Sequence, residues 1–218
     1  MGIAERRERE KRMRRQQILD AAKKVFSAKG FSCATIESIA EEAELSPATL
    51  YLYFKNKDEL YASLNLKMLE VLTKKIEEVY ARKELSPEEK IPALAEAMYQ
   101  VYEFDPLILI NVLQFQSSEA LKNLSPQLLE EIKADSARAL RTIARIFQDG
   151  MQEGQFVQEN AIALADIAWS LFGGLILWEE GKRIFDSKKN YLKPTLQIAF
   201  EILKRGVKRH QDAGKRTN

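Results

Sequence analysis

Four times along the chain, a helix-capping residue stands directly before a proline: Ser46-Pro47, Ser86-Pro87, Asp105-Pro106 and Ser125-Pro126. Proline fits the first position of a helix, because its missing N–H would have no intrahelical partner there. Strand signals are scarce, since the chain shows no sustained alternation of apolar and polar residues and has 9 Gly among its 218 residues. The pattern predicts an all-α globular protein.

The apolar periodicity between these starts predicts nine helices. They span residues 8–29, 36–43, 47–53, 57–81, 87–103, 106–120, 126–153, 161–184 and 191–210. Gly30 and Gly154 stand where C-terminal caps belong, because glycine readily adopts positive φ. The first three helices are short and the later ones are long. This change indicates a three-helix domain over residues 1–55, followed by a bundle of about six helices over residues 56–218.

Residues 18–54 have the spacing of a helix-turn-helix. Two apolar stripes mark the first two helices, Glu44-Leu45 makes a minimal turn, and Ser46-Pro47 begins a short third helix. Leu50 and Phe54 return to the core. The third helix then exposes short or flat side chains that can approach the major groove of DNA, namely Ala48, Thr49, Tyr51, Leu52 and Tyr53.

An ordered pattern runs through residues 14–62: Gly30-Phe31, then TIESIAEEA at 35–43, then LSPATLYLYFKNKDEL at 45–60. It resembles the DNA-binding domain of the TetR/AcrR family of bacterial repressors. The resemblance implies an all-α homodimer with an N-terminal reader and a C-terminal domain that binds a ligand and dimerises. It also implies a transcriptional regulator that represses from a palindromic DNA operator and responds to a small apolar ligand.

By position, the resemblance gives several residues a role at DNA. Thr35 and Lys57 match phosphate contacts, and Ser46 matches the cap of the third helix. The positions from Pro47 to Thr49 match residues that face bases, and the two tyrosines that follow match aromatic contacts to sugar-phosphate and base edges. The DNA-binding candidates are Thr35, Ser46, Pro47, Ala48, Thr49, Tyr51, Leu52, Tyr53 and Lys57.

Two positions depart from the family's pattern. Glu44 stands where the family usually has Gly, so it either adopts left-handed dihedrals at a cost of about 1 kcal/mol or the turn differs. Leu52 stands where the family often has an aromatic or polar residue. A leucine can touch a thymine methyl group but cannot read a hydrogen-bonding edge.

The charge is uneven along the chain. Residues 1–30 carry 10 Lys and Arg against 4 Asp and Glu, and residues 203–218 carry 6 against 1, so the rest of the chain is acidic. Basic ends suggest an anionic partner at one surface. The stretch from Arg6 to Arg15 is compatible with two interpretations: a solvated, charged helix face, or an arm that contacts the DNA backbone. No apolar run follows it, so no export signal is expected.

Residues 161–178 contain two polar residues, Asp166 and Ser170, and nearly reach the length of a membrane span. We favour a helix whose outer face is covered by a second copy of the chain, since the charge at Asp166 would be costly in lipid. The expected contact is a four-helix interface with residues 191–210. Its candidates are Ile167, Leu171, Gly174, Leu175, Trp178, Leu196, Ala199, Ile202 and Leu203.

The later helices also carry large apolar side chains that are expected to face one another: Met98, Tyr99, Tyr102, Phe104, Ile110, Leu113, Phe115, Phe147, Trp169 and Phe172. They can form a filled core or line a pocket for an apolar or aromatic effector. The pocket candidates are Met98, Tyr99, Tyr102, Phe115, Phe147, Trp169 and Phe172. A closed core would instead favour an architectural or adaptor DNA-binding protein that needs no ligand.

Enzyme functions find little support in the sequence. The chain has no Gly-x-Ser-x-Gly, no Gly-x-Gly-x-x-Gly and no phosphate loop, and its single His lies near the C-terminus. One Cys and one His also exclude a disulfide framework and a four-ligand Cys/His zinc site. We therefore expect a non-enzymatic protein without cofactor or metal. The lone Cys33 suits a reducing cytoplasm.

Overall fold

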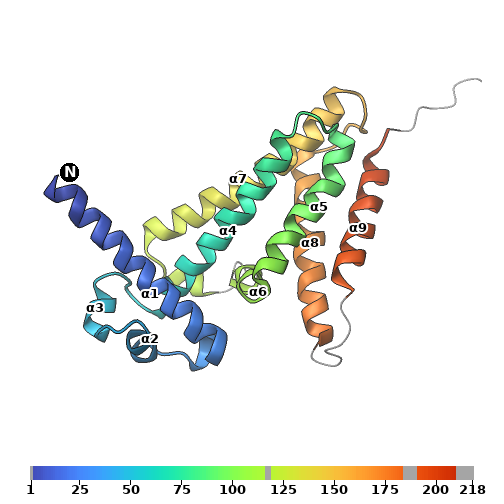
Figure 1. Cartoon of the computed structure of the whole chain (residues 1–218). Helices are drawn as coiled ribbons and strands as arrows, with labels where there is room; N and C mark the ends of the chain where they lie inside the picture. Colours follow the sequence, from blue (N-terminus) through green and yellow to red (C-terminus); the bar gives the residue numbers. More distant parts are fainter. Residues whose placement is uncertain (1, 116–118, 184–190, 210–218) are drawn as a thin grey trace, which may run out of the picture. The chain divides into compact units, whose positions relative to one another are not determined.

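The computed structural model describes residues 2–115, 119–183 and 191–209, apart from the side chains of residues 107, 108, 111, 114, 115, 119 and 120 (Figure 1). Regular structure in these residues is helical. The elements are α1 (Ile3–Cys33), α2 (Ile36–Glu42), α3 (Pro47–Tyr51), α4 (Lys57–Ala81), α5 (Pro87–Phe104), α6 (Pro106–Phe115), the 3-10 helix η1 (Glu119–Asn123), α7 (Pro126–Gln152), α8 (Ala161–Arg183) and α9 (Leu192–Val207). The predicted all-α fold is confirmed.

The capping signals in the sequence explain where the helices begin and end. The hydroxyls of Ser46 and Ser86 accept hydrogen bonds from the backbone N–H groups of Thr49 and Glu89, so both serines are N-caps. Gly30 and Gly154 both have a φ of 72°. Gly30 interrupts α1 with ψ of 164°, so the regular helix stops there, as the sequence predicts.

Several predicted boundaries differ from those of the structure: the first helix continues beyond residue 29 to Cys33, and the third ends at Tyr51 rather than at residue 53. The first helix begins at Ile3 rather than at residue 8. The prediction missed these residues because they are exposed and carry no apolar periodicity. The predicted helix 106–120 ends as α6 at Phe115, and residues 116–118 lie outside the described part of the chain. The predicted helix 191–210 ends as α9 at Val207, and residue 210 is not among the described residues.

The chain divides into two compact units. Unit 1 is Met1–Met68 with Gln114–Ile132, and unit 2 is Leu69–Leu113 with Lys133–Asn218. The helix α4 contributes residues to both units. The domain boundary expected at residue 55 stays a prediction.

In unit 1, α1 packs on α2 and α2 packs on α3. The core of this unit comes from apolar side chains with 2% exposure or less, among them Ile18, Ala22, Ile39, Leu50, Phe54 and Leu60. Burial of these side chains provides the main stabilisation of the three short helices, which would be marginal alone.

In unit 2, α5 and α8 both pack on α9. Ion pairs join Lys193 to Glu96 and Lys208 to Glu88, so α9 is tied to α5 near both of its ends. The segment after α7 returns to the end of α9, where the N–H of Val157 donates to the carbonyl oxygen of Val207 at 2.9 Å.

Candidate nucleic-acid interface

The turn between α2 and α3 has the geometry of a helix-turn-helix. The N–H of Leu45 donates to the carbonyl oxygen of Ala40 at 2.8 Å, which closes the end of α2. Glu44 has a φ of 53° and is the one non-glycine residue with positive φ in the described chain. Of the two alternatives for this position, the structure therefore has the left-handed one, which costs about 1 kcal/mol for a residue with a Cβ.

The short helix α3 is held by its N-cap and by its buried inner face. Ser46 caps its first turn, and the hydroxyls of Ser46 and Thr49 lie 2.9 Å apart. Leu50 and Phe54 are buried, one helical turn apart, and anchor the inner face. The outer face is consequently open to solvent.

Four of the DNA-binding candidates lie on that open surface. Pro47 and Ala48 are exposed, while 54% of Tyr51 and 80% of Leu52 remain accessible. Thr49 is half-buried beside the cap. Leu52 is largely exposed, so its side chain contributes little to the core of unit 1.

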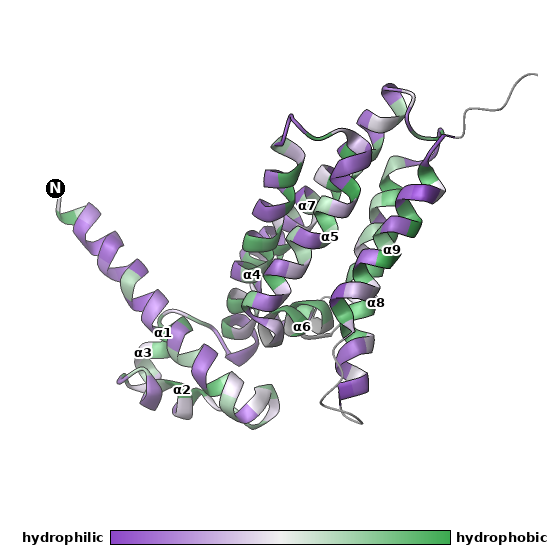
Figure 2. Ribbon diagram, turned by 45° about the vertical axis from the view of Figure 1, so that its right-hand side comes forward, coloured by the Kyte–Doolittle hydropathy of each residue, from purple (hydrophilic) through white to green (hydrophobic). Residues whose placement is uncertain are grey.

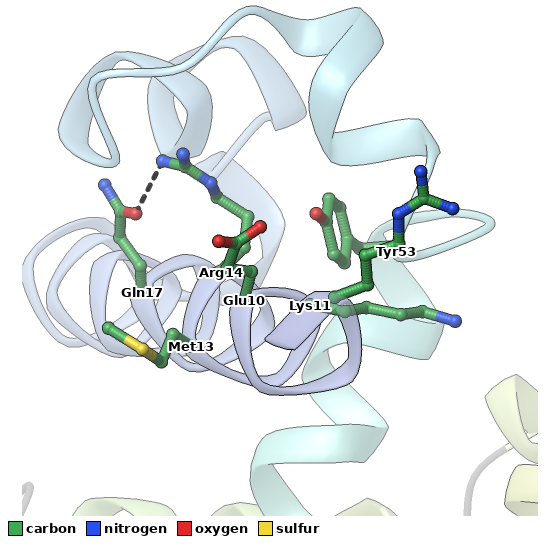
Figure 3. Close-up of a pocket in the computed structure, with 7 residues that line it drawn as sticks. Glu10, Lys11, Met13, Arg14, Gln17 and Tyr53 are labelled. Atoms are coloured by element: carbon green, nitrogen blue, oxygen red, sulfur yellow. Dashed lines mark hydrogen bonds between the residues drawn. The ribbon is translucent and has the colours of Figure 1, made fainter. Parts of the chain in front are cut away.

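Tyr53 is turned toward α1 rather than fully outward. It is half-buried and lines a pocket of about 720 Å³ together with α1 residues (Figure 3). The α1 residues of this pocket are Arg7, Glu10, Lys11, Met13, Arg14 and Gln17. The aromatic ring therefore lies between the helix-turn-helix and a basic face of α1.

Thr35 is the N-cap of α2. Its hydroxyl oxygen accepts a hydrogen bond from the N–H of Ser38 at 3.1 Å, and the hydroxyl of Ser38 donates to the carbonyl oxygen of Thr35 at 3.0 Å. Thr35 is exposed, so its own hydroxyl hydrogen is available to an acceptor such as a phosphate oxygen.

Lys57 has a structural role that the sequence did not reveal. Its ammonium donates to the carbonyl oxygens of Phe31 and Ala34 at 2.8 and 2.9 Å, and lies 4.4 Å from the centre of the Phe31 ring. The side chain thus closes the end of α1 from the first residue of α4. These two bonds use two of its three ammonium hydrogens.

The pocket candidates lie in the interior of unit 2 where they are described. Met98, Tyr99, Tyr102, Phe147 and Phe172 are buried, and Trp169 is half-buried. The side chain of Phe115 lies outside the described residues. Phe104 was expected to face the other helices, but this is wrong: it is the last residue of α5 and 78% of it is exposed.

Tyr102 brings a polar group into this interior. Its hydroxyl donates to Oε1 of Glu180 at 2.6 Å, and the same oxygen accepts from Arg183 at 2.9 Å. Burial raises the pKa of the Tyr102 hydroxyl, and the hydrogen bond to Glu180 raises it further. Tyr102 is therefore neutral at physiological pH and acts as a donor.

The dimer candidates follow one face of α8 and α9. Ile167, Gly174, Trp178 and Ile202 are exposed, and Leu171, Leu175, Ala199 and Leu203 are half-buried. The prediction that Leu196 belongs to the dimer interface is wrong, because this residue is 1% exposed and packs within its own protomer. Several of these residues line an apolar groove of about 680 Å³ between α8 and α9, with Val157 and Val207 at one end.

By length and composition alone, the helix α8 could cross a membrane. In the protomer, a third of its most apolar 18-residue stretch is buried. Gly173 faces inward, where an added Cβ would lie 3.2 Å from Cδ2 of Leu113, whereas Gly174 faces open space. The buried stripe shows that α8 packs as part of a helical bundle.

A capped recognition helix behind a tight turn, with its outer face free, defines the first unit as a helix-turn-helix DNA-binding unit. The second unit is a helical bundle, so the class is that of two-part, all-α transcription regulators. The sequence profile of bacterial regulatory proteins of the tetR family matches residues 18–64, and that of the QacR-like C-terminal region matches residues 82–207. The chain belongs to the TetR family of DNA-binding transcriptional regulators.

A curated relative and two solved structures extend this comparison. The fatty acid metabolism regulator protein of Bacillus subtilis is 26% identical over 157 residues, which cover 72% of this chain and 78% of that protein. The regulator PfmR of Thermus thermophilus has a TM-score of 0.69 at 23% identity and covers 88% of this chain and 99% of its own. FadR of B. subtilis in complex with stearoyl-CoA has a TM-score of 0.68 at 22% identity. The match covers 88% of this chain and 98% of the FadR chain.

Proposed function

We propose that the protein is a cytoplasmic, homodimeric repressor that binds a near-palindromic operator and releases it when an amphiphilic acyl compound binds unit 2. The observation that carries the DNA-binding part is the outer face of α3, which leaves Pro47, Ala48, Tyr51 and Leu52 accessible. These side chains are short or flat enough for the major groove. Thr35 offers a phosphate contact beside them.

Dimerisation through α8 and α9 is supported by the apolar face that these helices leave open. Ile198 and Ile202 are one helical turn apart on α9 and more than half exposed, and Ile167 and Trp178 are exposed on α8. A second copy would cover this face in a four-helix contact. Two recognition helices would then read half-sites about one helical turn of DNA, or a small multiple of it, apart.

An acyl effector is supported by the relative named for fatty acid metabolism and by the chemistry of the interior of unit 2. The buried aromatic and aliphatic side chains of α5, α7 and α8 suit an apolar chain. The buried hydroxyl oxygen of Thr73 on α4 has no hydrogen-bond partner among the described residues. A polar group of a ligand would satisfy it.

The helix α4 is the proposed connection between ligand and operator, because it supplies residues to both units. A ligand that prefers one position of α4 would favour one separation of the two recognition helices. About 3 kcal/mol of coupling changes operator affinity about a hundredfold.

The test begins with selection of genomic DNA fragments by the full chain at moderate salt, followed by anisotropy titrations on the selected site. We expect one near-palindromic site, and a fall of about a hundredfold in affinity with stearoyl-CoA below its micelle concentration. Free coenzyme A is the control and should leave the affinity unchanged. Failure to select any site contradicts the DNA-binding proposal.

The interior of unit 2 also favours a second candidate function. Phe147 and Phe172 are completely buried, as they would be in a filled core. A ligand-independent architectural or adaptor protein would retain the operator whatever compound binds. If calorimetry shows that stearoyl-CoA binds but operator affinity does not change, the ligand-independent function is favoured over the ligand-responsive one.

A further inference from the structure

The first 15 residues of α1 are mostly exposed, and their contacts with the rest of the chain lie mainly near their C-terminal end. We call residues 3–17 the α1 extension. Residues 3–14 are all exposed, and the buried stripe of α1 begins at Ile18. At 1.5 Å per residue the extension is about 20 Å long. Since an unpacked helix adds little to folding stability, the fold of unit 1 does not explain why this segment is there.

The extension is largely hydrophilic (Figure 2), and its sequence carries more Lys and Arg than Asp and Glu. Arg7, Lys11 and Arg14 are spaced four and three residues apart, so they share one helix face. With Tyr53 they line the 720 Å³ pocket of Figure 3. Glu10 also lines it, but its carboxylate accepts from Arg6 at 2.9 Å. Arg7 and Lys11 have no ion-pair partner in the described chain, so this face carries a net positive charge.

The base of the extension is fixed to the rest of unit 1. The guanidinium of Arg15 donates to the hydroxyl of Ser63 at 3.0 Å and lies 4.7 Å from the centre of the Phe54 ring. Ser63 belongs to α4, and Phe54 follows the recognition helix. The basic face is consequently held in a defined position relative to α3.

Tyr53 links this face to the recognition surface. It stands directly after Leu52, which is 80% exposed at the end of α3, and it lines the same pocket as Arg7 and Lys11. The basic face of α1 therefore adjoins the residue that follows the exposed end of α3. Arginine and lysine side chains on such a face position a protein on the duplex through phosphates and read no sequence.

We propose that the α1 extension is a second DNA-binding element, in which Arg7, Lys11 and Arg14 contact the phosphates beside the base pairs that α3 reads. The inference rests on the proposed DNA-binding function and adds residues to it. The extension has too few apolar residues to insert into a lipid surface, since Ile3 and Met13 are its only large ones.

The test compares two double variants with equal loss of charge. Arg7→Ala/Lys11→Ala removes the pocket face, and Arg9→Ala/Arg12→Ala removes two cations from the opposite face of the same helix. For the first, we expect operator affinity at low salt to fall about tenfold or more. The slope of log affinity against log salt should shrink by three to four units, at roughly 0.9 per phosphate contact and four contacts per dimer. The second should change the slope by less than one unit.

Three further measurements keep the outcomes distinct. Arg7→Lys should retain the wild-type slope, because a phosphate contact needs only the charge. Hydroxyl-radical footprints of Arg7→Ala/Lys11→Ala should lose protection at phosphates next to each half-site while keeping the half-site itself. Circular dichroism melts should be unchanged, since neither side chain packs in the fold.

If the wild-type chain binds its operator specifically but the two double variants change affinity and salt slope equally, the role of the α1 extension is overturned. The proposed function then remains intact. Absence of specific binding by the wild-type chain would overturn both. An unchanged footprint in the Arg7→Ala/Lys11→Ala variant also contradicts the inference, because the phosphates beside the half-site would then not depend on this face.

Discussion

The ammonium of Lys57 lies 2.8 Å from the carbonyl oxygen of Phe31 and 4.4 Å from the centre of its ring. The residue thus joins the start of α4 to the end of α1, a segment 26 positions earlier in the sequence. The family pattern predicts a phosphate contact at Lys57, but in this chain two of its three ammonium hydrogens are already used within unit 1.

Lys57→Met should destabilise unit 1. The methionine keeps an apolar body over the Phe31 ring but leaves the carbonyls of Phe31 and Ala34 without their donor, which costs about 1–3 kcal/mol. Urea unfolding measures the loss. Lys55→Met, an exposed neighbour with the same change of charge, should be nearly neutral. Weaker DNA binding by Lys57→Met at unchanged stability would instead assign the residue to phosphate alone.

Leu52→Ala should relax the preference for one base in each half-site. With 80% of its surface accessible, Leu52 contributes little to folding, so its truncation should not affect stability. It should remove a contact with a thymine methyl group, and that contact is worth about 1 kcal/mol of binding free energy. Binding to a set of operators substituted one base at a time measures this. Lys55→Ala removes an exposed positive charge three residues after Leu52 and no base contact, so it should weaken all of them equally. An unaltered ranking of bases in Leu52→Ala would place Leu52 outside the groove.

Ile202→Glu should produce monomers. Ile202 is 63% exposed in the protomer, so the charge does not disturb the core, but it would be desolvated in a contact between two copies. Sedimentation at micromolar protein gives the mass. Gln197→Glu adds the same charge to α9 at an exposed position away from the groove, and should leave the dimer intact. A dimer of unchanged stability in Ile202→Glu would exclude this face.

Gly150→Ala should destabilise unit 2 by about 1–3 kcal/mol, because a Cβ there would overlap the ring of Phe156. Phe156 is fully buried, and its ring lies 6.3 Å from that of Phe147, so it has little room to move. Gly181→Ala is the matched control: nothing lies within 4 Å of the added carbon, and the helix should gain about 0.5–1 kcal/mol. Similar unfolding midpoints for both variants would contradict this packing.

Glu179 should make unit 2 sensitive to acid. Burial opposes its charged form, but the hydrogen bonds from the Lys182 ammonium at 2.5 Å and the Tyr191 N–H at 2.9 Å outweigh burial and lower the pKa of Glu179. The folded pKa is then below the unfolded value of about 4.3, so this stabilisation is complete above that value and is lost as pH falls through the folded pKa.

Urea unfolding between pH 7 and pH 3 tests the role of Glu179. Glu179→Gln should be less stable than wild type at pH 7, and the difference should shrink as the pH falls below about 4.3. Glu159→Gln, at an exposed position just before α8, should show the wild-type pH dependence. Parallel curves for wild type and Glu179→Gln would mean that the carboxylate does not tie α8 to the start of α9.

The sequence by itself determined most of the local structure. Serine before proline places helix starts such as those of α3 and α5, because the cap and the fixed φ of proline act within a single turn. The spacing of Leu50 and Phe54 likewise predicts which face of α3 is buried. The same local rules failed for residues 3–7, since a fully solvated helix has no apolar period by which to recognise it.

Tertiary structure decided which partner each side chain takes. Leu196 and Ile202 both belong to the apolar face predicted for α9, yet Leu196 is buried in the protomer and Ile202 is open. Periodicity shows that a helix has an apolar side, but the positions of α5 and α8 determine how much of it they cover. A long cation such as Lys57 has the same freedom: water, phosphate or a carbonyl oxygen can satisfy it. The choice depends on groups that only the fold brings within hydrogen-bond distance.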